Sequence, residues 1–78
     1  MQCFFVHIKC KLGRTYDVAA MLADREIASE IHSISGEYDL LAKFYLAEGE
    51  DIGRFIADHL HDVPGVERTV TTLTFKAF

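Results

Sequence analysis

The chain has 78 residues, half of them hydrophobic, and it carries 8 Lys and Arg against 12 Asp and Glu, for a formal net charge of −4. The length predicts one domain, and the acidic balance argues against the basic surface with which proteins neutralise nucleic-acid phosphates. No stretch approaches the ~20 apolar residues of a membrane span, and the N-terminus lacks a signal-peptide pattern, so we expect a soluble cytoplasmic protein.

A domain this small needs support beyond its own core, because it buries only ~60% of the surface that its unfolded chain exposes. Cys3 and Cys10 lie in what reads as one strand, roughly 23 Å apart, whereas a disulfide needs Cα atoms within about 7 Å. No C-x-x-C pair occurs and the four histidines are scattered, so neither a metal nor a cofactor is predicted. We therefore expect oligomerisation to supply the missing burial.

Residues 3–11 alternate in the period-2 pattern of a strand, with one side predicted to face the core: Phe4, Val6, Ile8 and Cys10. The other side is mixed, with Phe5 and His7 flanked by lysines. Such a face is expected to be partly covered by something other than this chain. After Gly13, Thr15 is predicted to cap a helix in which Val18 and Leu22 stack at i and i+4.

From Ala23 the sequence supports two interpretations. Local propensity would continue the helix through the run DREIASEIH. Alternation over residues 27–34 instead favours a strand that leads toward the turn at Ser35-Gly36. Single-sequence reasoning does not decide between them.

Residues 38–46 form the clearest predicted strand, and residues 66–77 the last one, rich in Thr and Val. Between them, Asp51 is predicted to cap a helix that Pro64-Gly65 ends. With residues 27–35 extended, the order is β-α-β-β-α-β, a ferredoxin-like α+β sandwich with two helices on one face of a four-stranded antiparallel sheet. The other face would be bare, and a homodimer would bury the residues that could line it: Phe5, His7, Leu41, Tyr45 and Val70.

Two motifs now stand in order along the chain: Gly36-Glu37-Tyr38-Asp39 and Pro64-Gly65-Val66-Glu67-Arg68-Thr69. Together they resemble the effector-binding (RAM) domain of Lrp/AsnC transcription regulators, over essentially the whole chain. The resemblance selects the extended interpretation of residues 27–35. It implies that residues 1–78 form one ligand-binding and oligomerisation domain. Full-length members carry an N-terminal helix-turn-helix domain, which this sequence lacks, so we expect a stand-alone module without DNA binding of its own.

The resemblance also implies a ligand, partners and a site. The ligand would be an amino acid or related small effector, held where homodimers meet in a larger ring, and a full-length Lrp/AsnC regulator is a further expected partner. Carried over by motif, the ligand-binding residues are Ser35, Gly36, Tyr38, Asp39, Thr69 and Thr71. Asp39 would accept the ammonium, while amides beside Gly36 and the threonine hydroxyls would serve the carboxylate.

Ordinary structural roles remain open for the same residues. Asp39 could accept a backbone amide near the turn, Tyr38 could be a half-buried sheet aromatic, and both threonines suit a strand whatever its function.

Two other protein classes share the predicted strand order. A small dimeric α+β barrel enzyme would use His7 or His32 as an acid-base group, but no convergent catalytic set is visible, and we expect no enzyme. An ACT domain would sense amino acids with sheets side by side instead of face to face.

Overall fold

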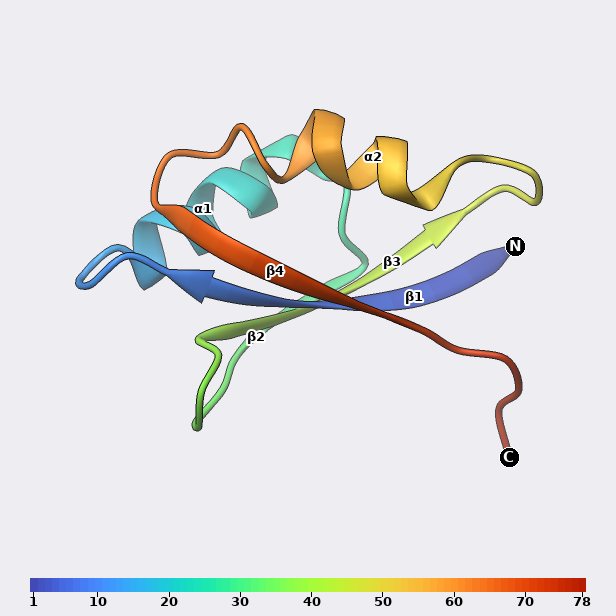
Figure 1. The fold of residues 1–78 in the computed structure, drawn as a ribbon, viewed down its shortest axis with the longest axis horizontal. Helices are drawn as coiled ribbons and strands as arrows, with labels where there is room; N and C mark the ends of the chain where they lie inside the picture. The colour runs from blue at the N-terminus through green and yellow to red at the C-terminus, as the bar shows by residue number, and fades with distance from the viewer.

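The computed structural model describes residues 1–78, which form a four-stranded antiparallel sheet with both helices on one face (Figure 1). The strands lie in the order β2-β3-β1-β4, so the first and third strands occupy the centre. The predicted ferredoxin-like α+β fold is confirmed. The elements are β1 (Gln2–Cys10), α1 (Thr15–Arg25), β2 (Glu30–Ser33), β3 (Leu40–Leu46), α2 (Ile52–His59) and β4 (Val66–Leu73).

The core lies between the sheet and the helices and is entirely apolar. Phe4 of β1 stacks on Phe44 of β3 with ring centroids 5.3 Å apart, and Phe55 of α2 packs edge-on against both rings. The buried residues are Phe4, Val6, Ile8, Cys10, Val18, Leu22, Leu40, Ala42, Phe44, Ile56, Leu60 and Val63. The side of β1 predicted to face the core is therefore the buried one.

The ambiguous segment is extended, as the resemblance predicted. Helix α1 ends at Arg25 because Glu26 adopts the left-handed conformation, with φ 55°, and its amide donates to the Ala23 carbonyl at 3.1 Å. The chain then leaves the helix, and β2 pairs with β3 so that Ile31 packs against the core. Burial of that side chain outweighs the local helix propensity.

Several predicted boundaries are wrong. Strand β2 spans only Glu30–Ser33 instead of residues 27–35, and β1 spans Gln2–Cys10 instead of residues 3–11. Thr15 is not a cap: α1 begins after Arg14, whose carbonyl accepts the Val18 amide at 3.0 Å, and no side chain caps this end. Strand β3 begins at Leu40 instead of residue 38. Strand β4 ends at Leu73 instead of residue 77, and at the next position the Thr74 hydroxyl donates to the Cys3 carbonyl at 2.8 Å.

Helix α2, in contrast, begins as predicted. The Asp51 carboxylate accepts the Arg54 amide at 3.1 Å, the usual N-cap bond. Neither helix is long and apolar enough to cross a membrane.

The face of the sheet opposite the helices, here called the open face, is bare within one chain (Figure 1). The register places His7 beside both Leu41 and Val70, and Phe5 beside Lys43 and Thr72. The five residues predicted for this face therefore share it. The hairpin between β2 and β3 also bends to this side, away from the helices (Figure 1).

Candidate functional site

The hairpin from Ile34 to Asp39 carries four of the six predicted ligand-binding residues. The Ile34 amide donates to the Asp39 carbonyl at 3.0 Å and closes its base. Gly36 lies at the turn with φ +100°, a conformation that glycine adopts without a Cβ clash. The Ser-Gly turn signal thus produces the reversal that it predicted.

Asp39 joins this hairpin to β1. Its amide donates to the Ile8 carbonyl at 3.0 Å, and its Oδ2 accepts the Cys10 amide at 2.8 Å. The Lys9 ammonium lies 3.8 Å from the same oxygen. Because β3 begins only at Leu40, the Cys10 amide has no β3 carbonyl opposite it, and the carboxylate takes the place of one.

Tyr38 and Glu37 join the hairpin to β4 across the open face. The Arg68 guanidinium donates to Glu37 Oε1 at 2.8 Å and lies over the Tyr38 ring, 5.4 Å from its centroid. The His7 ring meets the same tyrosine with centroids 5.7 Å apart, and its Nδ1 is buried without a hydrogen-bond partner. The two sequence motifs therefore meet through Arg68, a residue that the predicted site omitted although its motif had been recognised.

A cavity of about 460 Å³ lies between the hairpin and the start of α1. Asp39 is its one carboxylate, and hydroxyl groups make up much of the rest. The lining residues are Gly13, Thr15, Tyr16, Ser33, Ile34, Ser35 and Asp39. Two predicted residues, Ser35 and Asp39, thus face this cavity, while Gly36 and Tyr38 belong to the same hairpin outside the lining.

Thr69 and Thr71 lie elsewhere in the chain. The register puts Thr69 beside Ile8 and Thr71 beside Val6, on the face of the sheet that carries the helices, and the Thr69 hydroxyl lies 3.1 Å from His61 Nε2. Ser33, Leu40, Ile8 and Thr69 form one row across the sheet. Three strand spacings separate its ends, roughly 14 Å, so one chain does not bring the threonines to the hairpin cavity.

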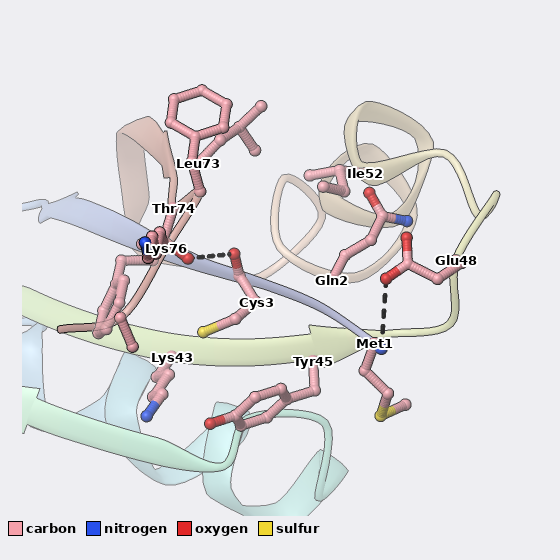
Figure 2. Close-up of a pocket in the computed structure, with 13 residues that line it drawn as sticks. Met1, Gln2, Cys3, Lys43, Tyr45, Glu48, Ile52, Leu73, Thr74 and Lys76 are labelled. Atoms are coloured by element: carbon pink, nitrogen blue, oxygen red, sulfur yellow. Dashed lines mark hydrogen bonds and ion pairs between the residues drawn. The ribbon is translucent and has the colours of Figure 1, made fainter.

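A larger hollow, of about 700 Å³, lies at the opposite end of the sheet between the two chain ends (Figure 2). Its wall includes Phe5, Lys43 and Tyr45 from the open face, together with Met1 and residues 73–77. None of the predicted site residues lines it. We assign the candidate site to the smaller cavity because its lining is mostly polar and includes the hairpin motif, whereas this hollow is mainly apolar and bounded by the chain ends.

Charge on the open face gathers around Lys43. Its ammonium lies 5.3 Å from the Tyr45 ring centroid and 3.6 Å from Glu30 Oε2. The Tyr45 phenol first, and then the Glu30 carboxylate, raise the pKa of Lys43. A hydrogen bond from His32 at 3.0 Å, and then Lys43, lower the pKa of Glu30.

The two histidines of the enzyme hypothesis do not line either of these hollows. His7 packs under Tyr38, and His32 pairs with Glu30. No three His, Cys, Asp or Glu side chains come together as a metal would require. Neither histidine therefore lies where the enzyme hypothesis needs an acid-base group, at the wall of one of these two hollows.

The fold and the hairpin define a ferredoxin-like α+β domain with a candidate ligand cavity, and comparison with known families identifies its family. The model of the Lrp/AsnC ligand binding domain matches residues 3–78, so the chain belongs to the Lrp/AsnC family. The resemblance read from the two motifs is confirmed, and the ACT alternative is set aside.

Among curated proteins, the chain is 37% identical over 82 residues to an uncharacterized HTH-type transcriptional regulator of Pyrococcus horikoshii, PH1916. The match covers 86% of this chain and 55% of that protein, so the chain spans about half the length of the curated relatives it matches. These relatives carry the names of transcriptional regulators, which indicates a regulatory family instead of an enzyme family.

Two solved structures show the same fold. TTHA0845 from Thermus thermophilus is 31% identical, with a TM-score of 0.88, and the match covers 100% of this chain and 98% of that one. The transcriptional regulator NMB0573 of Neisseria meningitidis, solved as an L-Met complex, is 17% identical with a TM-score of 0.83, over 96% of this chain and 50% of that one. At that identity the likeness concerns the fold alone.

Proposed function

We propose that this domain is a non-catalytic amino-acid sensor that acts in transcription regulation. It would bind its ligand in the cavity between the hairpin and the start of α1, here called the hairpin cavity. The cavity between the hairpin and α1 carries the proposal: at about 460 Å³ it falls in the size range of small-molecule sites, and it offers hydroxyls and a carboxylate. The L-Met complex of NMB0573, a regulator with the same fold, supports an amino acid as the ligand class.

Thermal unfolding with each of the common amino acids tests this function. A ligand present at 100 times its Kd adds ~2.7 kcal/mol of stability, which raises the midpoint by several degrees in a domain of this size. We expect one amino acid, or a small group of related ones, to do so. If none shifts the midpoint of the folded protein, the sensor function is wrong.

A substitution that fills the cavity localises the effect. Ser35 is exposed and lines the cavity, so Ser35→Leu is expected to remove the ligand-induced shift while leaving the fold intact. Ser29 is also exposed but lies outside the lining, and Ser29→Leu serves as the matched control. Equal shifts in both variants would place the ligand elsewhere.

We further propose that two copies pack their open faces together and that such dimers assemble into a larger, even-numbered ring. Tyr45 and Val70 are 44% and 45% exposed on that face, and burying them would relieve the size limit of the domain. Contacts between dimers would also bring Thr69 and Thr71 of one copy toward the hairpin of another, which a single chain does not achieve. Light scattering on diluted protein tests the assembly, and a stable monomer contradicts it.

The remaining parts of the proposal concern partners. We expect no binding of DNA by these 78 residues, given the net charge of −4, and a cytoplasmic location beside a full-length regulator of the same family. A gel shift with mixed-sequence duplex at low salt, where electrostatic binding is strongest, checks the first expectation. Co-purification with such a regulator checks the second.

A further inference from the structure

We infer that Asp39 is a positioning residue: its carboxylate holds the hairpin from Ile34 to Asp39 onto β1, and effector binding does not need its charge. The inference rests on the proposed function, because it assigns a role within that site. It differs from the role that an amino-acid ligand suggests at first, in which this carboxylate accepts the ammonium group.

Asp39 makes three hydrogen bonds to other residues of the chain. The amide donates to the Ile8 carbonyl at 3.0 Å, the carbonyl accepts the Ile34 amide at 3.0 Å, and Oδ2 accepts the Cys10 amide at 2.8 Å. Thus one residue closes the hairpin base and joins it to the central strand twice. No other hairpin side chain bonds to the backbone of β1.

The side-chain bond has a specific structural reason. The β1–β3 register ends at Ile8 opposite Leu40, two residues before Cys10. The Cys10 amide would remain unpaired at this edge of the ladder, and a partly buried amide without an acceptor is costly. The Asp39 oxygen extends the ladder by one step beyond the point where the β3 backbone turns away.

The bonded oxygen is also the one nearest a cation. The Lys9 ammonium lies 3.8 Å from Oδ2, and the Asp39 side chain is only 29% exposed. A ligand ammonium at that oxygen would compete with the Cys10 amide for it and would approach the Lys9 ammonium. The hydroxyls of Thr15, Ser33 and Ser35 face the same cavity as acceptors with no such conflict.

Asp39→Asn and Asp39→Ala separate the two roles. Asparagine retains an oxygen acceptor for the Cys10 amide but no charge, whereas alanine has neither. The first readout needs no ligand: hydrogen exchange at the Cys10 and Ile34 amides. We expect protection within about threefold of wild type in Asp39→Asn, which keeps the bond without its charge, and faster exchange in Asp39→Ala, by about tenfold or more, as for a lost hydrogen bond to a charged group.

The second readout is the affinity for L-methionine as the probe, measured by calorimetry. Positioning predicts that Asp39→Asn stays within about threefold of wild type while Asp39→Ala loses about tenfold or more. Asp58→Asn, an exposed carboxylate on α2 outside the cavity lining, is the control for the loss of one charge.

Two results would overturn the inference. One is unchanged amide protection in Asp39→Ala; the other is an equal loss of L-methionine affinity in both variants, which would make Asp39 the ammonium acceptor. If wild type does not bind L-methionine or any other amino acid, the proposed function fails. The exchange readout still decides whether Asp39 positions the hairpin.

Discussion

The two faces of the sheet are built from alternate residues of the same strands, yet they meet different surroundings. On β3, Phe44 is fully buried under the helices, whereas the next residue, Tyr45, is 44% exposed on the open face. The helix-covered face is complete within one chain because α1 and α2 close it. The open face has no such cover, and the hairpin bends toward it. A strand pattern therefore specifies two faces, but the chain supplies the cover for only one of them.

The largest expected contrast is between these two neighbours. Phe44→Ala removes a ring stacked on Phe4 at 5.3 Å and is expected to cost ~3–5 kcal/mol. Tyr45→Ala leaves no cavity in the core, and in the monomer it should cost well under half as much. Urea unfolding at two protein concentrations measures both effects. If Tyr45→Ala is as costly as Phe44→Ala at the lower concentration, the two faces do not differ as described.

Two glycines with similar backbone conformations sharpen the contrast. Gly65 has φ +96° and a Cβ built there would lie 2.9 Å from Val18 Cγ2, whereas Gly36 has φ +100° and open space around it. Alanine at either position incurs ~1–2 kcal/mol of left-handed strain. We expect Gly65→Ala to cost a further ~1–3 kcal/mol from overpacking. Equal destabilisation of the two variants in thermal unfolding would contradict the close packing on the helix side.

The helix starts give a smaller contrast within the covered layer. Asp51→Ala removes the N-cap bond of α2 and is expected to cost ~1 kcal/mol. Thr15→Ala at the start of α1 removes no cap bond, so its effect should be smaller. Asp58→Ala, on the exposed side of α2, controls for the loss of a carboxylate. Thermal unfolding of the three variants distinguishes them, and a cost for Thr15→Ala equal to that for Asp51→Ala would be unexpected.

The sequence predicted the elements whose signals are strong and local. Alternation indicated the buried side of β1, and Asp51 indicated the start of α2. The segment after Ala23 could not be resolved from local propensity. Glu26 ends the helix in the left-handed conformation, and there is no glycine at that position to predict it. What decides this segment is the burial of Ile31 against distant strands, a tertiary effect.

The candidate site was less predictable for the same reason. The turn signal located the hairpin, and Ser35 and Asp39 indeed line its cavity. However, the bond from Asp39 to Cys10 and the pairing of Glu37 with Arg68 depend on strand order and on where β3 ends. The motifs assigned Thr69 and the hairpin to one ligand site. In the sheet, however, β3 and β1 separate β2 from β4, the strand that carries Thr69.

The smallest expected effect is the dependence of stability on pH, and it too compares the two sides. On the helix side, hydrogen bonding to Arg25 lowers the pKa of Asp62 from 3.8, and on the open face, hydrogen bonding to His32 lowers the pKa of Glu30 from 4.5. A carboxyl whose pKa is lower in the folded state stabilises the fold above its unfolded pKa. That stabilisation is lost as pH falls through the folded value.

Urea unfolding from pH 6 to pH 3 should therefore show stability decreasing below about pH 4.5, first through Glu30 and then through Asp62. Arg25→Gln should flatten the lower part of this decrease, and His32→Gln the upper part, because each removes the first cause of one shift. Lys11→Gln removes an exposed cation that pairs with no carboxylate and should leave the slope unchanged. Since both carboxyls are exposed, we expect small changes in stability. If the two variants alter the same part of the pH range, the carboxyls on the two sides of the sheet do not contribute separately.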